Sequence, residues 1–215
     1  MAHSHADVSH QFDDLEQQRE ASNLGMWAFL ATEVLFFGGM FAVYAVYRTL
    51  YFDAFVQGSK HMDVALGAIN TAVLLLSSLT VVLGVYAVQK GNNKSLVRYL
   101  IVTVLLGCVF LGIKAFEYAH KFSENLVPGA DFALSGPDAG HVQIYFLLYF
   151  IMTGLHAVHM VVGIGLMAVM AVMAHRGRFT PEYHNPIEVS GLYWHFVDIV
   201  WIFLYPLFYL IQVHR

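Results

Sequence analysis

The sequence predicts an all-α fold, that of a polytopic membrane protein with five transmembrane helices. Of the 215 residues, 58% are hydrophobic and only 12% are charged, whereas a soluble domain carries about 25% charged residues. The mean hydropathy is +0.60. Five apolar runs are each long enough to cross a bilayer as a helix, which rises about 1.5 Å per residue. A soluble chain of this length has no core large enough to bury so much apolar surface.

Composition also excludes several classes of function. The chain has 11 lysine and arginine residues and a formal net charge of −4, so it presents no basic face to nucleic acid. Its one cysteine, Cys108, allows no internal disulfide and no two-thiolate copper or iron–sulfur site within the chain. Residues 1–23 are polar and lack the pattern of a cleaved signal peptide. We expect a cytoplasmic N-terminal tail over 1–23 and a transmembrane domain over 24–213.

The five apolar runs set the expected boundaries of the helices. Backbone groups inside hydrocarbon must be satisfied within the segment, and the runs lack the alternation typical of a barrel strand, so helices are expected. The expected transmembrane helices are 24–47, 64–89, 96–118, 142–174 and 189–213.

The charges within these runs are few. The first run contains Glu33, the second none, and the third contains Arg98, Lys114 and Glu117 near its ends. We interpret Lys114 and Glu117, three residues apart, as an ion pair that snorkels to the membrane surface. The fourth run is uncharged and longer than a bilayer requires, and the fifth contains Asp198. No connection between the runs is long enough for a separate soluble domain.

The distribution of basic residues predicts that the N-terminus lies inside and the C-terminus outside. With that orientation, the inner segments hold six basic residues and the outer segments hold four. The inner ones are Arg19, Lys90, Lys94, Arg98, Arg176 and Arg178, and the outer ones are Arg48, Lys60, Lys121 and Arg215.

Two acids lie deep in the expected helices. Glu33 and Asp198 are each about nine residues into a helix that starts from the inner face, at a depth of roughly 13 Å. An ionised carboxylate there is costly, so each acid should be neutral or hydrogen-bonded and should face protein. Glu33 could have a functional role, in which it binds a proton or contacts a lipid headgroup. It could instead form a structural hydrogen bond to a neighbouring helix. His195, three residues before Asp198, suits a structural hydrogen bond to it.

Two more histidines, His156 and His159, lie one turn apart in the fourth run. They suit a metal site, but the run has no adjacent cysteine or carboxylate, so we interpret them as polar contacts between helices. A bis-histidine haem would use one of them together with His195. We expect a buried polar cluster of Glu33, His156, His159, His195 and Asp198, in one group or two. No nucleophile–base pair, phosphate loop or carboxylate dyad indicates catalysis.

Four sequence motifs resemble a known family. In chain order, the first run contains TEVLFFGGMFAVY, FEYAHKF covers the end of the third run and the residues just after it, the fourth run contains TGLHAVHMVVGIG, and the last contains GLYWHFVDIVWIFLYPLFYL. In this order they resemble subunit III of the haem–copper oxidases, over about residues 24–213. The chain is similar to the shorter, five-helix bacterial form, which lacks the first helix pair of the long form and the wall that this pair contributes to a lipid-filled cleft.

The resemblance implies a non-catalytic subunit of a proton-pumping cytochrome c oxidase in the bacterial inner membrane. Haems and copper are then held by partner subunits and none by this chain. The implied partners are the catalytic subunit I, subunit II, small subunits and bound phospholipid. The implied roles are packing on subunit I, holding lipid, and supporting proton uptake and O₂ access. The family also implies the inside N-terminus.

Residue by residue, the resemblance covers both intramembrane acids and the loop before the last helix. Glu33 falls on the family's buried acid, His159 on the second histidine of its helix motif, and 194–198 on its Trp-His-Phe-Val-Asp run. Arg176 and Thr180 fall on lipid-headgroup positions, and Arg178 is a further basic candidate.

Other functions remain open at this point. A quinol oxidase subunit III and the accessory protein of nitric oxide reductases are relatives within the same class. A self-contained b-type cytochrome with His195 as haem ligand is a second class. A transporter or channel is a third, but the second run offers only a few small polar residues to line a path.

Overall fold

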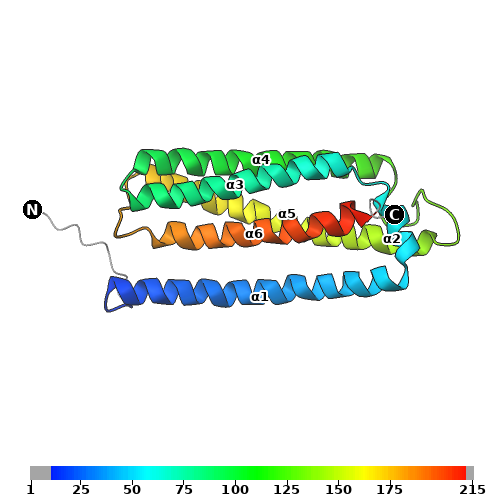
Figure 1. Ribbon diagram of the computed structural model, residues 1–215, viewed down its shortest axis with the longest axis horizontal. Helices are drawn as coiled ribbons and strands as arrows, with labels where there is room; N and C mark the ends of the chain where they lie inside the picture. Colours follow the sequence, from blue (N-terminus) through cyan, green and yellow to red (C-terminus); the bar gives the residue numbers. More distant parts are fainter. Residues whose placement is uncertain (1–10, 212–215) are drawn as a thin grey trace, which may run out of the picture.

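The computed structural model describes residues 11–211, and in this part the chain forms six α-helices and no strand (Figure 1). The helices are α1 (Leu15–Leu50), α2 (Phe52–Ser59), α3 (Val64–Gln89), α4 (Asn93–Ser123), α5 (Ala139–His175) and α6 (Asn185–Tyr209). All except α2 are long and apolar enough to cross a membrane. The expected all-α fold with five membrane-spanning helices is confirmed.

The first helix begins earlier than the apolar run. The Asp14 side chain accepts a hydrogen bond of 2.8 Å from the Gln17 amide and so caps α1. The negative charge of Glu16 in the first turn stabilises the helix, because it lies at the positive end of the helix dipole. Residues 15–23, which we expect in a polar tail, are therefore helical. Hydropathy registers only the part of a helix that lies in lipid, so it does not register this polar extension. The tail residues 1–10 lie outside the described residues.

The other helices also differ from the expected boundaries at their ends. The short helix α2 lies between the first two spans and packs against α5 through Phe55 and Tyr145, whose rings are 5.5 Å apart. The helix α4 extends to Ser123, five residues beyond the apolar run. Pro186 in the first turn starts α6 before residue 189, and α6 ends at Tyr209. Residues 212 and 213 of the expected last helix lie outside the described residues.

The helices α3, α4, α5 and α6 form a bundle, and α1 lies along its side (Figure 1). The helix α6 contacts α1, α3 and α5, and it is the most deeply buried of the five long helices. The most apolar stretch of α6 is 61% buried within the chain, whereas that of α1 is 17% buried. Most of the surface of α1 therefore faces lipid or another protein.

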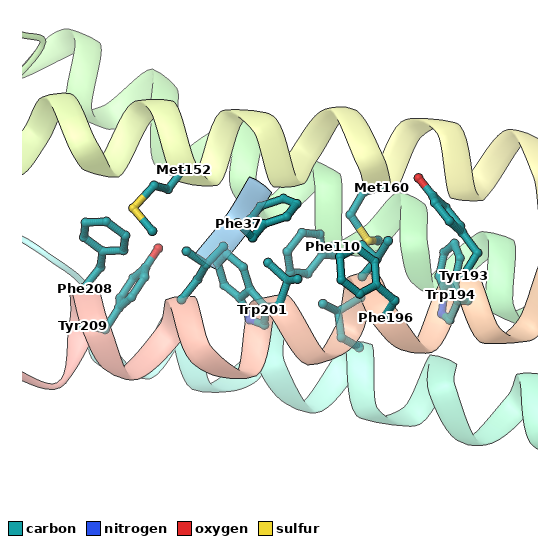
Figure 2. Packing of buried hydrophobic residues seen from close by; sticks show 14 of the residues in the cluster. Phe37, Phe110, Met152, Met160, Tyr193, Trp194, Phe196, Trp201, Phe208 and Tyr209 are labelled. Carbon is teal, nitrogen blue, oxygen red and sulfur yellow. The ribbon is translucent and has the colours of Figure 1, made fainter. Parts of the chain in front are cut away.

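Two indoles of α6, Trp194 and Trp201, lie at the centre of the buried cluster (Figure 2). Gly107 of α4 and Gly163 of α5 make room for Trp194. A Cβ at Gly107 would lie 2.9 Å from the Trp194 ring, and one at Gly163 would lie 3.1 Å from it. The indole nitrogen of Trp194 donates to the hydroxyl of Ser77 on α3 at 3.0 Å. The small residues therefore let three helices close around one large side chain.

Candidate functional site

The intramembrane acid of α1 is paired with a histidine of α5. Glu33 Oε2 lies 3.1 Å from His159 Nε2, and both side chains are half-buried. The other ring nitrogen of His159, Nδ1, lies 2.9 Å from the Leu155 carbonyl oxygen. A carbonyl can only accept, so Nδ1 carries a proton. The contact between Glu33 and His159 needs one more proton, which sits either on the carboxyl or on Nε2.

Neighbouring aromatic side chains enclose this pair. The Phe37 and His159 rings pack in a T-shaped arrangement, with 5.3 Å between their centroids. The Tyr193 hydroxyl of α6 donates to the His159 carbonyl at 3.1 Å. The pair therefore ties α1 to α5, and Tyr193 adds α6 to the same junction.

His195 does not form the expected hydrogen bond with Asp198. Its Nδ1 lies 2.6 Å from the Ser78 hydroxyl of α3. Spacing within one helix predicts a contact within that helix, but the ring bonds to a hydroxyl of the neighbouring helix α3, and the Asp198 oxygens have no hydrogen-bond partner within residues 11–211. The predicted intrahelical pair is wrong, and His195 instead joins α6 to α3.

Asp198 is 3% exposed, and neither carboxyl oxygen has a hydrogen-bond partner within residues 11–211. Ser78 lies beside it as well, but the short hydrogen bond joins that hydroxyl to His195. An ionised carboxylate without donors is costly to bury. These surroundings therefore suit a neutral carboxyl group.

His156 differs from the expected polar contact between helices. Its ring lies between those of Phe110 and Trp201, at centroid distances of 5.6 and 5.3 Å, and neither ring nitrogen has a partner in the described part of the chain. The expected cluster of five residues is consequently divided. Glu33 and His159 form one pair, while His195, Asp198 and His156 lie in separate contacts.

The histidines also bear on the haem hypothesis. His159 bonds to α1, His195 bonds to α3, and His156 packs between aromatic rings. Residues 11–211 contain no group of three or more His, Cys, Asp or Glu side chains that could hold a metal ion. Each imidazole therefore has its own neighbours among the described residues, and a bis-histidine haem, which needs two imidazoles that face one gap, stays a hypothesis.

A buried polar network that the sequence pattern did not predict joins α4, α5 and α6. Lys114 Nζ lies 2.9 Å from Glu117 Oε2, 3.0 Å from the Tyr149 hydroxyl and 2.9 Å from the Tyr209 hydroxyl. Tyr209 also donates to Glu117 Oε1 at 2.6 Å. Each charged side chain is 5% exposed. The ammonium has three N–H groups and three partners, so its donors are fully used.

This network corrects the interpretation of Lys114 and Glu117 as a snorkelling pair. The helix α4 continues past them to Ser123, and α5 and α6 cover that face with Tyr149 and Tyr209. Lys114 also lies about 5 Å from the ring centroids of Tyr149 and Trp201, where the faces of the rings attract a cation. The only sign of this network in the sequence is that Tyr149 and Tyr209 lie within apolar runs. Their role as hydrogen-bond partners of Lys114 depends on how the helices pack.

Comparison with known proteins decides the family. Residues 8–213 match the family model described as cytochrome c oxidase subunit III. The chain belongs to that family. It is 32% identical over 192 residues to cytochrome c oxidase subunit 3 of Corynebacterium diphtheriae, a match that covers 88% of each chain. It is 31% identical over 209 residues to quinol oxidase subunit 3 of Bacillus subtilis, covering 96% of each.

A third relative is longer than this subunit III. The chain is 31% identical over 212 residues to a probable cytochrome c oxidase subunit 3 of Rickettsia conorii, and the match covers 89% of this chain but 68% of that protein. The resemblance found in the sequence motifs is thus confirmed. Five spans and this family together make the chain a multi-pass membrane subunit of an oxidase complex.

The basic loop of subunit III lies between α5 and α6. Arg176, Arg178 and Thr180 are all exposed, and neither arginine forms an ion pair with any other described residue. The Thr180 hydroxyl accepts a hydrogen bond of 3.1 Å from the Tyr183 amide. An apolar groove of about 430 Å³ between α4 and α5 reaches His175, the residue before Arg176.

Proposed function

We propose that this chain is the non-catalytic subunit III of a bacterial haem–copper terminal oxidase of the cytochrome c oxidase type. In this proposal it packs on the catalytic subunit I, near subunit II and small subunits, in the inner membrane. The partner subunits hold the haems and copper and reduce O₂ to water, and this chain holds none of these cofactors. Its own roles are to bind phospholipid and to support proton uptake and O₂ access.

The observation that carries the proton role is the contact between Glu33 and His159. The two side chains lie within hydrogen-bond distance, and the pair is half-buried rather than sealed from the surface. A group that can accept or release a proton next to the catalytic subunit suits proton buffering. The same contact also fixes α1 against α5, so the proton role and the packing role need separate tests.

Two variants of Glu33 separate these roles. Glu33→Gln keeps the size of the side chain and an N–H that donates to His159, but it cannot titrate. Glu33→Leu leaves His159 Nε2 without a partner. We expect Glu33→Leu to lower the retention of this subunit in the purified complex. We expect Glu33→Gln to assemble fully and to lose activity during sustained turnover. Undiminished turnover of the Glu33→Gln complex would contradict the proton role and leave only packing.

The lipid role is supported by the basic loop and the groove that ends beside it. Two arginines without carboxylate partners in the described chain lie next to an apolar groove between two membrane-spanning helices. Guanidinium groups bind phosphate through paired hydrogen bonds. We expect Arg176→Ala to remove tightly bound phospholipid in lipid analysis of the complex, whereas unchanged lipid content would contradict this site. An inside N-terminus, supported by the count of basic residues, places this loop at the inner face.

A second candidate is subunit III of a quinol oxidase. The match to the Bacillus subtilis quinol oxidase subunit 3 over 96% of each chain favours it. The electron donor separates the two candidates: the purified complex should oxidise reduced cytochrome c under the first proposal and ubiquinol under the second. Nitric oxide reduction in the same assay would instead identify an accessory protein of that reductase.

A further inference from the structure

An apolar groove lies at the end of the bundle opposite the α5–α6 loop. It has a volume of about 780 Å³ and runs between the last turns of α1 and of α6. Residues of one face of α1, with Phe52 of α2, line one wall, and residues of α6 line the other. Tyr44, Ala45 and Arg48 of α1 face Phe203 and Leu207 of α6 across the groove.

The groove extends along α1 and α6 toward the end of the bundle that carries α2 (Figure 1). The rings of Phe41 and Phe203 meet at 6.1 Å between centroids, in the part of the helices nearer the middle of the bundle. Arg48 and Phe52 lie about two to three turns further along the chain. A molecule in the groove would therefore have its apolar part within the bilayer and its polar part near Arg48.

Most polar groups in the groove are already used within the protein. The Tyr44 hydroxyl donates to the Leu207 carbonyl, and the Thr49 hydroxyl donates to the Ala45 carbonyl at 2.8 Å. Arg48 has donors to spare. The half-buried Arg48 interacts with the Tyr44 hydroxyl, but a guanidinium has five N–H donors, and no carboxylate of the described chain lies within ion-pair distance of it.

A cation without a carboxylate at the mouth of an apolar groove suits a ligand with a phosphate and a hydrocarbon chain. The guanidinium can donate two parallel hydrogen bonds to phosphate oxygens, and the groove is of the size that binds small molecules, about 300–1,000 Å³. We propose that this groove binds one phospholipid, with its phosphate on Arg48 and part of one acyl chain between α1 and α6. This site lies at the opposite end of the bundle from Arg176, and it does not depend on which oxidase contains the chain.

The proposed lipid would also explain why α1 can pack so loosely on the bundle. Ring contacts at 6.1 Å join Phe37 to Phe196 and Phe41 to Phe203, and beyond Phe41 the two helices enclose the groove. Burying an acyl chain there would bring both helices into apolar contact through the lipid. The lipid would thus act as part of the packing between α1 and α6.

The test uses the full chain, purified with the subunits that it retains and placed in phosphatidylglycerol nanodiscs. A small fraction of this lipid carries a diazirine in the middle of one acyl chain. After illumination, mass spectrometry of peptides measures the labelling of residues 41–52 and 203–207. We expect Arg48→Gln to lower labelling there roughly tenfold, because a charge-assisted pair of hydrogen bonds is lost.

Two further variants make the result specific. Lys60→Gln removes an exposed cation at the same end of the chain but outside the groove, so we expect labelling within twofold of the unmodified chain. Ala45→Phe keeps Arg48 but fills an exposed position in the groove, so we expect it to lower labelling as Arg48→Gln does. Unchanged labelling of peptides from α4 shows that each variant is folded and inserted.

Two outcomes would overturn the proposal. Equal labelling in the Arg48→Gln and unmodified chains would mean that only unselected boundary lipid touches the groove. Absence of labelling in the unmodified chain, with the groove peptides protected by a neighbouring protein, would mean that another subunit occupies it.

Discussion

Lys114 and Glu117 lie 2.9 Å apart inside the junction of α4, α5 and α6, and each side chain is 5% exposed. Two tyrosine hydroxyls complete their hydrogen bonds, one from α5 and one from α6. Removing one partner of such a pair leaves an uncompensated buried charge, which costs about 3–5 kcal/mol, whereas replacing both by apolar side chains is often neutral.

This asymmetry yields the first prediction. Lys114→Met should strongly lower the temperature at which subunit III dissociates from the purified complex. The double variant Lys114→Met/Glu117→Leu should recover most of that loss. Dissociation temperature measured by native gel after heating gives the comparison. A double variant as unstable as the single one would show that the charges themselves, and not only their pairing, are required.

The second prediction concerns the glycine that faces Trp194. Alanine normally stabilises a helix relative to glycine by up to about 1 kcal/mol. At Gly107 the added Cβ would lie 2.9 Å from both Ile164 and Trp194, whereas at Gly112 no atom lies within 4 Å. Gly107→Ala should therefore lower the thermal stability of the subunit, by about 1–3 kcal/mol from overpacking, and Gly112→Ala should leave it equal or higher. Equal effects of the two variants in the same thermal assay would count against this packing.

The third prediction concerns the hydrogen bond between His195 and Ser78. Ser78→Ala should leave His195 Nδ1 without its partner and cost about 1–3 kcal/mol of stability. Ser123 is a matched control, because its hydroxyl is exposed and bonds only to the carbonyl of His120 on its own helix, at 2.7 Å. Ser123→Ala should change stability by less than about 0.5 kcal/mol. Chemical denaturation of the subunit in detergent compares the two, and similar losses would exclude a specific role for Ser78.

The fourth prediction concerns His61, in the segment between α2 and α3 and outside the membrane-spanning helices. Partial burial and the neighbouring ammonium of Lys121 both disfavour the imidazolium, and together they hold the pKa of His61 below its usual value of 6.5. Lys121 also donates a hydrogen bond to the His61 carbonyl. We expect an NMR titration of labelled histidine to place the His61 pKa below 6.5, and Lys121→Gln to raise it.

The lowered pKa of His61 determines how the stability of the folded protein depends on pH. The unfolded chain binds a proton at His61 more readily than the folded chain does. The contribution of His61 to stability is therefore complete above pH of about 6.5 and is lost as the pH falls through that value toward the folded pKa. A His61 pKa above 6.5 in the folded protein would reverse this dependence and contradict the structure.

The sequence by itself determined the number of spans, the acids within them and the family. These properties are local, because a run of about 20 apolar residues specifies a membrane helix whatever surrounds it, and the motifs around Glu33 and Asp198 can be read along the chain. The pairing of Glu33 with His159 was within reach of the sequence, because both were expected in one polar cluster.

Only the tertiary structure decided which faces of the helices meet. Spacing within α6 placed Asp198 next to His195, but the hydroxyl of Ser78 on α3 takes that hydrogen bond. The apolar length of the third run placed Lys114 and Glu117 at a membrane surface. In the structure, Tyr149 of α5 and Tyr209 of α6 enclose them, although Tyr209 is 95 residues from Lys114 in the sequence. Arg48 is one of several basic residues in the sequence, and it becomes a candidate phosphate ligand only because α6 forms the second wall of its groove. Burial and hydrogen bonding between distant segments depend on which helix covers which face, and hydropathy along one helix does not contain that information.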